Sequence, residues 1–231
     1  MPTLNTIVKN TLIALGMSPH KLPKRKPPII DLYKIDKEIC DEYDHLATHT
    51  LVDRNRIAFL KQFAKSVKSL EGDVAEVGVY KGGTAWLLAK NLEDTKKTIY
   101  IFDTFEGMPE TRADKDWHKK GDFNDAPLEF VKKFLADRKN IEIYQGYFPQ
   151  TSPPIVNKKF CMVHIDVDIY QSVWDCCEFF YPRMVASGLM VFDDYGFLTC
   201  PGAKEAVDTF FATKPEKPIY LLTGQALVIK S

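Results

Sequence analysis

The chain has 231 residues, of which 45% are hydrophobic and 27% charged, and its 31 lysines and arginines equal its 31 aspartates and glutamates. This composition is that of a soluble globular protein with a sizeable core, and the length fits one α/β domain with an N-terminal extension better than two domains. A formal net charge of zero argues against a general nucleic-acid binder, which usually shows a basic excess.

The first part of the chain is predicted to be a helical extension or lid, residues 1–70, before a main domain at 71–231. Residues 1–21 hold only short, interrupted apolar runs, which argues against a signal peptide or a membrane span. We expect a short amphipathic helix there that docks either on the body of the protein or on a second subunit. In the second case the protein would be a homodimer. A proline-rich linker follows at Leu22–Pro28, and a polar segment of helical periodicity runs from Asp31 to Leu70.

The cysteines predict a reducing compartment. Their number is odd and none forms a CxxC pair, so a cytoplasmic location is the simplest interpretation. The five are Cys40, Cys161, Cys176, Cys177 and Cys200.

After Gly72, short apolar runs alternate with helical stretches, which is typical of a parallel sheet built from βαβ units. Strands are predicted at Val74–Val79, Thr98–Asp103, Ile141–Gln145, Phe160–Ile165, Leu189–Phe192, Ile219–Leu222 and Ala226–Ile229. Helices are predicted at Gly83–Asn91, Ala126–Ala136, Ser172–Met184 and Cys200–Ala212.

The last two predicted strands should form an antiparallel hairpin. Only Thr223, Gly224 and Gln225 separate them, which is too short for a helical crossover. Five strands in a βα series and a hairpin predict an α/β, Rossmann-like sheet of seven strands, mostly parallel, with an antiparallel last strand. Class I methyltransferases have this outline, but it does not by itself separate them from other Rossmann-like folds.

The loop after the first strand carries the first ligand-binding signal. Glu76, Gly78 and Tyr80 lead into Gly82-Gly83-Thr84, at a junction where glycines let the backbone turn tightly beside a ligand. The GxGxxG pattern of dinucleotide binders is missing, and a carboxylate here suits a cationic group, such as a methionine amino group, better than a pyrophosphate. The alternative is that these small residues only start the helix.

The second strand ends in Asp103, followed by Thr104 and Phe105. A carboxylate at this position can accept hydrogen bonds from both ribose hydroxyls, although it could instead cap the next helix. Loops around Asp122 and at Gly146–Phe148 could pack against an adenine ring. Aromatic side chains after a strand are, however, more often part of the core.

Four carboxylates follow the fourth and fifth strands, namely Asp166 and Asp168, then Asp193 and Asp194. These strands should be neighbours about 4.8 Å apart, so the carboxylates should meet at the edge where α/β folds bind ligands. A cation would relieve their repulsion, and all-oxygen ligation favours magnesium, with calcium or manganese open. Solvated carboxylates that cap helices would explain one aspartate, but not four. His164 is interpreted as a packed residue beside this cluster.

Taken together, these motifs resemble the macrocin O-methyltransferase family, metal-dependent class I enzymes that methylate sugar and other hydroxyls in antibiotic biosynthesis. The resemblance covers roughly Leu51 to Ser231 and rests on EVGVYKGGTA, FDTFEGMPE, GDF, GYFPQT, HIDVDIYQS and FDDYG. The chain departs from the family at Val167, where glycine is expected, and in its N-terminal region, which does not align.

The resemblance implies roles for the clustered residues. It implies that Asp166, Asp193 and Asp194 coordinate magnesium, and that Asp168 is the general base. It also implies that S-adenosylmethionine lies among the residues of the first two strand ends: Glu76, Gly78, Gly82, Gly83, Thr84 and Asp103. Asp166 is expected to reach the cofactor as well.

The expected reaction is therefore methyl transfer to a hydroxyl oxygen of a small molecule, with no nucleic acid or membrane as partner. A metal would acidify the hydroxyl and hold the acceptor while Asp168 takes the proton. Sugars, polyketide or nucleoside hydroxyls and catechol-like phenols all remain candidates. Two other functions stay open: an NAD-dependent oxidoreductase, disfavoured by the missing GxGxxG, and a catalytically silent cofactor- or metal-binding module, disfavoured because all four carboxylates are present.

Overall fold

The structure is a computed structural model that describes residues 37–231. The amphipathic helix expected at 1–21, the linker at 22–28 and the start of the helical segment at Asp31 lie outside the described residues. None of the helices between residues 37 and 231 has the length and apolar character that crossing a bilayer requires.

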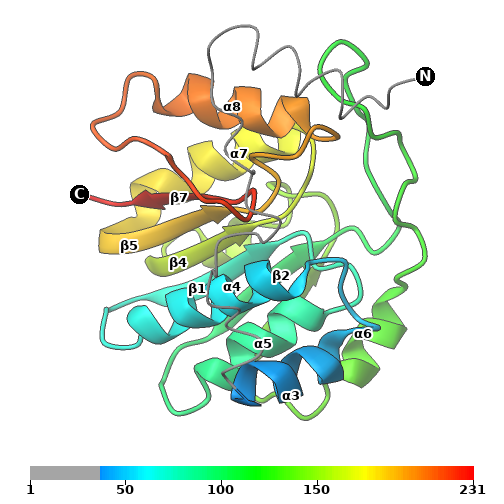
Figure 1. Ribbon diagram of the computed structural model, residues 1–231, viewed down its shortest axis with the longest axis vertical. Helices are drawn as coiled ribbons and strands as arrows, with labels where there is room; N and C mark the ends of the chain where they lie inside the picture. Colours follow the sequence, from blue (N-terminus) through cyan, green and yellow to red (C-terminus); the bar gives the residue numbers. More distant parts are fainter. Residues whose placement is uncertain (1–36) are drawn as a thin grey trace, which may run out of the picture.

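A sheet of seven strands forms the middle layer, in the order β3-β2-β1-β4-β5-β7-β6 (Figure 1). Neighbours from β3 to β5 pair in parallel, while β7 runs antiparallel to both β5 and β6. The predicted Rossmann-like sheet, its antiparallel last strand and its terminal hairpin are confirmed. The strands are β1 Asp73–Val77, β2 Ile99–Asp103, β3 Ile141–Gln145, β4 Phe160–Ile165, β5 Met184–Phe192, β6 Ile219–Tyr220 and β7 Ala226–Ile229.

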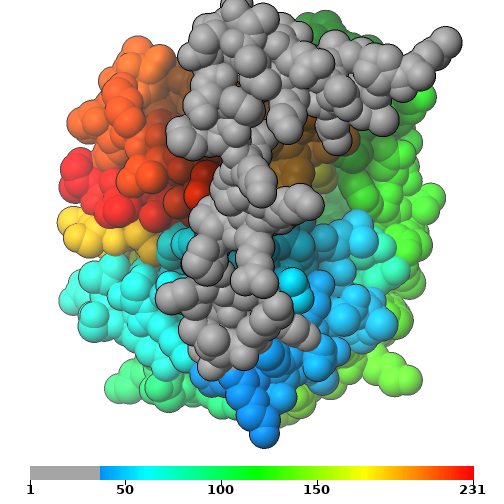
Figure 2. Space-filling view, in the orientation of Figure 1, coloured from blue at the N-terminus to red at the C-terminus, as the bar shows by residue number. Residues whose placement is uncertain are grey.

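Helices cover both faces of this sheet. Side chains alternate along a strand, so in β1 Val74 packs toward one layer while Ala75 and Val77 pack toward the other. The first layer holds α3 Lys37–Leu46, α4 Arg54–Ser66, α5 Gly83–Asn91 and α6 Leu128–Phe134, and the second holds α7 Tyr170–Phe180 and α8 Pro201–Phe211. Figure 1 shows α7 and α8 above the sheet and α3, α4 and α5 below it. In the same orientation, Figure 2 shows the orange and red C-terminal part above the blue and cyan helices.

The helices α3 and α4 share the core of the sheet domain. Leu46 from α3 and Ile57 and Leu60 from α4 are fully buried in the same apolar cluster as α5. Burying one such side chain stabilises the folded state by about 1.5–3 kcal/mol. A buried ion pair of 2.6 Å between Lys61 and Glu42 joins the two helices. The described part of the predicted extension is thus firmly attached to the sheet.

Several element boundaries differ from those expected. The helix predicted to reach Met184 ends at Phe180 and continues as a 3₁₀ turn, because Pro182 cannot donate a helical hydrogen bond and disfavours helix in the residue before it. Met184 instead begins β5, which was predicted to start only at Leu189. In the same way α6 starts after Pro127 rather than at Ala126.

Candidate active site

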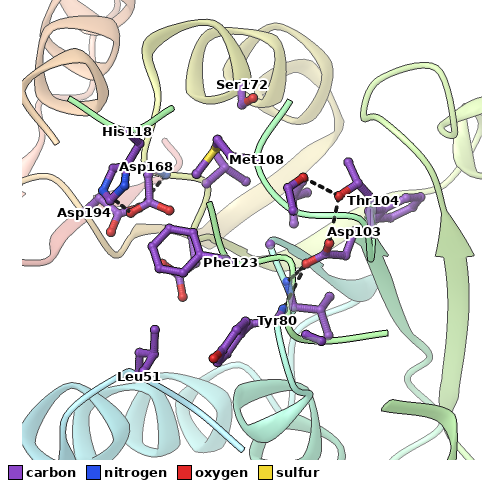
Figure 3. Close-up of a pocket in the computed structure, with 18 of the residues that line it drawn as sticks. Leu51, Tyr80, Asp103, Thr104, Met108, His118, Phe123, Asp168, Ser172 and Asp194 are labelled. Atoms are coloured by element: carbon purple, nitrogen blue, oxygen red, sulfur yellow. Dashed lines mark hydrogen bonds and ion pairs between the residues drawn. The ribbon is translucent and has the colours of Figure 1, made fainter. Parts of the chain in front are cut away.

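A cavity of about 290 Å³ opens at the carboxyl ends of β1 to β5. Parallel sheets bind ligands at this edge, because the loops after neighbouring strands meet there. In Figure 3, Asp103 and Thr104 lie at one end of the cavity and His118, Asp168 and Asp194 at the other. The two groups of residues singled out in the sequence therefore face one shared space.

The structure brings most of the predicted site residues to this cavity, but not all of them. Those that line it are Gly78, Tyr80, Thr84, Asp103, Thr104, Phe105, Gly146, Phe148, Asp166, Asp168 and Asp194. Those that lie outside its lining are Glu76, Gly82, Gly83, Asp122 and Asp193.

The turn after β1 depends on Gly78. Its φ is +86°, and a Cβ there would lie 1.7 Å from the backbone oxygen of Asp166, where no atom fits. The missing side chain thus lets the ends of β1 and β4 approach each other. Farther along, the Gly83 N–H donates to the His49 oxygen at 2.9 Å, so this end of α5 already has a protein partner.

Asp103 holds the cofactor-side loops together. Its Oδ2 accepts from the Val79 and Tyr80 N–H groups at 2.7 and 2.9 Å, and its Oδ1 accepts from the Phe105 N–H at 2.8 Å. The side chain therefore fixes the loop after β1 to the loop after β2. Thr104 Oγ1 lies 3.5 Å from Oδ1, but its single proton donates to the Gly107 oxygen at 2.7 Å. A carboxylate has about four acceptor positions, so one remains for a ligand hydroxyl.

A chain of charged groups lies behind the cavity wall. His164 is fully buried, with Nδ1 2.8 Å from Glu76 and Nε2 3.4 Å from Asp193. Burial lowers the pKa of His164, but the bonds to Asp193 and Glu76 outweigh it and raise that pKa to about 10. The imidazole is thus a cation shared by two carboxylates at neutral pH.

Asp193 has three partners. Besides His164, it accepts from the Gln225 Nε2 at 2.8 Å and from the Arg56 guanidinium. Burial alone would raise the pKa of Asp193, but His164, Arg56 and Gln225 together lower it, so this carboxylate is ionised. Arg56 comes from α4, and its guanidinium also stacks 4.7 Å from the centre of the Phe197 ring.

The other three aspartates have too little positive charge around them. Burial and the neighbouring carboxylates hold the pKa of Asp166 and Asp194 well above its usual range. Burial also raises the pKa of Asp168, and the nearby His118 offsets part of this rise. This corner of the cavity therefore favours a bound cation or protons.

Backbone strain gathers in the same cavity. Tyr80, Phe105, Phe123 and Asp168 have positive φ angles of 50°, 55°, 63° and 58°, and all four line the cavity. At Asp168 the Ile169 N–H donates to the Val167 oxygen at 2.6 Å, which closes a γ-turn around the carboxylate. Such backbone states cost about 1–3 kcal/mol each and are concentrated at ligand sites.

Most of the chain matches one known protein family. The model of the macrocin O-methyltransferase family (TylF) matches residues 31–222, most of the chain. The chain belongs to the macrocin O-methyltransferase family. The resemblance drawn from the motifs is thereby confirmed.

Two curated relatives match this chain over about two thirds of its length. A curated tetracenomycin-C rhamnosyl 4'-O-methyltransferase of Streptomyces olivaceus is 29% identical, over 67% of this chain and 66% of its own. Demethyldecarbamoylnovobiocin O-methyltransferase of Streptomyces niveus is 26% identical, over 71% of this chain and 68% of its own. The chain thus spans about two thirds of the curated relatives it matches.

Solved structures show the same fold for this family member. The O-methyltransferase NovP superposes with a TM-score of 0.66 at 24% identity, over 79% of this chain and 82% of its own. A calicheamicin methyltransferase superposes with a TM-score of 0.65 at 16% identity, over 89% of this chain and 94% of its own. The class I Rossmann-like fold is confirmed by these superpositions.

Three cavity residues of this family member were missed by sequence reasoning: Arg56, His118 and Cys200. Arg56 lies in a polar helix and carries no motif, so only the fold shows that it reaches Asp193. His118 and Cys200 lie just outside the recognised motifs, three residues before GDF and four after FDDYG. In the fold His118 Nε2 lies 3.6 Å and Cys200 Sγ 3.3 Å from Asp168 Oδ1. An isolated histidine in a long loop was the one available signal for His118.

Proposed function

We propose that this chain is an S-adenosylmethionine-dependent O-methyltransferase that methylates a hydroxyl of a small molecule of the sugar or natural-product type. Family membership supports the reaction type, and the two curated relatives are named as O-methyltransferases of a rhamnosyl-tetracenomycin and of a demethyldecarbamoylnovobiocin. The observation that carries the proposal is the single cavity that joins the Asp103 loops to Asp166, Asp168 and Asp194.

In this proposal the cofactor lies at the Asp103 end. Asp103 has one acceptor position left for a ribose hydroxyl, and Gly78, Tyr80 and Thr84 form the wall beside it. Glu76 is buried behind that wall, and its Oε2 has no hydrogen-bond partner in the structure. An unpaired buried carboxylate oxygen suits an ammonium group, so the site fits the methionine end of the cofactor. S-adenosylmethionine supplies an electrophilic methyl group on a sulfonium.

A divalent cation, magnesium by the oxygen donors present, is proposed at the aspartate end. The raised pKa values of Asp166 and Asp194 point to missing positive charge there, which fits a cation. Asp193 is the third proposed ligand, but its carboxylate is already paired with Arg56, so a metal has to compete with that guanidinium. A cation beside the acceptor supplies charge that makes a hydroxyl more acidic.

Asp168 is proposed as the general base. Its backbone is fixed by the γ-turn and by its N–H, which donates to Asp194 Oδ2 at 2.9 Å, so the carboxylate is held at the cavity surface. A hydroxyl in the cavity would pass its proton to Asp168 as its oxygen attacks the methyl carbon. Holding both reactants in one cavity supplies much of the remaining acceleration.

The described part of residues 1–70 is proposed to cover this site. Leu51, Val52 and Arg56 come from this region and line the cavity, which suits the expected lid over the acceptor. No disulfide bond joins the cysteines of residues 37–231, in keeping with the proposed cytoplasmic location. A homodimer through the N-terminal arm also stays a proposal.

The decisive experiment supplies methyl-labelled S-adenosylmethionine with a panel of sugar, polyketide, nucleoside and phenol acceptors, with and without magnesium. We expect label to appear on one hydroxyl class and to disappear with a chelator. Label on nitrogen, or labelling that a chelator leaves unchanged, would refute the substrate class or the metal role respectively. Absence of binding to S-adenosylhomocysteine would refute the methyltransferase function altogether.

A further inference from the structure

A mixed group of nitrogen, oxygen and sulfur donors lies beside the aspartates. His118 Nε2 is 3.6 Å from Asp168 Oδ1 and 3.7 Å from Cys200 Sγ, and the thiol is 3.3 Å from that same oxygen. All three residues line the cavity, and the three donor atoms lie within 4.8 Å of one another. They come from three separate segments, so the fold brings them together.

The spacing of these atoms matches a tetrahedral metal site. Zinc bonds of about 2.0–2.3 Å to nitrogen, oxygen and sulfur place neighbouring ligand atoms about 3.3–3.6 Å apart. The three observed separations, 3.3, 3.6 and 3.7 Å, lie within a few tenths of an ångström of that range. Three protein ligands with a fourth position toward a cavity is also the pattern of zinc sites that bind water or substrate.

Each donor is held in place by the chain around it. His118 Nδ1 lies 3.3 Å from Asp122 Oδ2, the carboxylate contact that commonly orients a metal-binding imidazole. Asp116, two residues earlier, accepts from the backbone N–H groups of Arg112 and Tyr170 at 2.8 and 2.9 Å and so fixes the His118 loop. Cys200 immediately precedes α8, and Asp168 sits in its γ-turn. The site needs little rearrangement to bind an ion.

The geometry points to a binding site for a thiophilic divalent cation of the zinc class, formed by His118, Asp168 and Cys200 and separate from the all-oxygen cluster of Asp166, Asp193 and Asp194. Without a metal, the Cys200 thiol donates to Asp168 and Asp194 lies nearby. Burial and these carboxylates raise the pKa of Cys200, so binding releases a thiol proton as the thiolate becomes a ligand. Because thiolates select soft ions, magnesium does not compete for this site.

Cobalt(II) is the probe, because it binds in zinc sites and its absorption spectrum depends on the atoms that coordinate it. Metal-stripped full-length protein is titrated with cobalt(II) in excess magnesium. We expect visible absorption bands of a tetrahedral ion and a near-ultraviolet thiolate-to-cobalt band, both saturating at one cobalt per chain. Zinc should abolish both bands. A magnesium-sensitive signal without the thiolate band would overturn the inference.

Variants assign the ligands. Cys200→Ser should remove the thiolate band, whereas Cys40→Ser, which changes a partly exposed cysteine of α3, should retain it. Asp122→Asn keeps all three ligands and should weaken cobalt binding by about 10- to 100-fold. If Cys200→Ser folds poorly, His118→Gln serves in its place and should abolish the tetrahedral bands. Retention of the thiolate band in Cys200→Ser, or its loss in Cys40→Ser, would contradict the assignment.

Metal binding at His118, Asp168 and Cys200 is measured by spectroscopy alone and does not depend on the proposed reaction. If methyl transfer occurs as proposed, zinc should inhibit it, because the ion occupies the Asp168 oxygen that takes the proton. Cys200→Ser should relieve that inhibition. Zinc inhibition that is equally strong in Cys200→Ser would place the inhibitory ion elsewhere.

Discussion

At the scale of single residues, Asp168 shows how its backbone conformation and its proposed chemistry are linked. Its positive φ of 58° turns the carboxylate out of the line of β4 and into the cavity. Asparagine tolerates this conformation nearly as well as aspartate, so it removes the charge without straining the turn.

We predict that Asp168→Asn lowers turnover by about 10²- to 10⁴-fold, the usual contribution of a general base. Binding of S-adenosylhomocysteine, measured by calorimetry, should stay close to that of the wild type, because the Asp103 end is untouched. Turnover equal to the wild type would exclude Asp168 as the base.

The Arg56 guanidinium pairs with the Asp193 carboxylate, whose negative charge a metal would otherwise neutralise. Replacing it by methionine leaves Asp193 with His164 and Gln225 only, so magnesium should raise the melting temperature more in Arg56→Met than in the wild type. Arg54→Met, which changes an exposed arginine two residues earlier in the same helix, is the control. An equal magnesium shift in Arg56→Met and the wild type would show that Asp193 does not take part in metal binding.

The sequence motifs revealed the residues that a ligand needs locally, but not those that reach the site from a distance. Asp103 and the aspartates stand at strand ends, so their position follows from the sheet. Glu76 lies within the predicted first strand, yet only the packed structure shows that one of its carboxylate oxygens is hydrogen-bonded to His164. Arg56 meets Asp193 across 137 residues of sequence, which no local pattern records.

At the scale of elements, the turn between β1 and α5 sets the distance between two strand ends. We predict that Gly78→Ala lowers the free energy of unfolding by about 2–5 kcal/mol, from steric overlap and positive-φ strain together. Gly121 is a matched control with the same φ of +86° but nothing within 4 Å of an added Cβ. Chemical denaturation measures both variants, and equal losses would show that the contact with Asp166 is unimportant.

Glu216 ties the connection after α8 to β7. Its carboxylate accepts from Lys230 Nζ, Ser231 Oγ and Tyr181 Oη at 2.6, 2.6 and 2.7 Å. Burial raises the pKa of Glu216, but these three partners outweigh it and hold that pKa well below 4.5. The ionised form therefore stabilises the fold at any pH above the unfolded value of about 4.5 and loses that contribution as the pH falls.

We therefore predict that Glu216→Gln is less stable than the wild type at pH 7, by about 1–3 kcal/mol. The difference should shrink as the pH drops below 4.5, because Glu216 then takes up a proton in the unfolded wild type but stays ionised in the folded one. Thermal denaturation of both proteins between pH 3 and 7 measures this. A difference independent of pH would mean that charge plays no part.

Periodicity placed the central elements well because β1, β2 and β4 are buried on both faces, so each of them is a short, largely apolar run in the sequence. The ends were harder to place. The 3₁₀ turn at Tyr181–Arg183 and the early start of β5 depend on Pro182 and on pairing between Met184 and Phe160, which is a tertiary contact.

At the scale of the whole molecule, the proposed cofactor and metal bind two ends of one cavity, and both should stabilise the folded state. We predict that S-adenosylhomocysteine at about 100 times its Kd adds about 2.7 kcal/mol to the free energy of unfolding. Magnesium should add a further increment that Asp194→Asn removes. A thermal shift caused by NAD instead of S-adenosylhomocysteine would favour an oxidoreductase.

The order of the sheet has a consequence for biosynthesis. Strand β7 lies between β5 and β6, so one edge of β5 has no partner until residues 226–229 have left the ribosome. Gln225, which donates to Asp193, immediately precedes that strand. A nascent chain therefore displays an apolar, unpaired edge and an incomplete acidic corner until residues 225–229 have emerged from the ribosome, and chaperones that shield β-edges should associate with it during that interval.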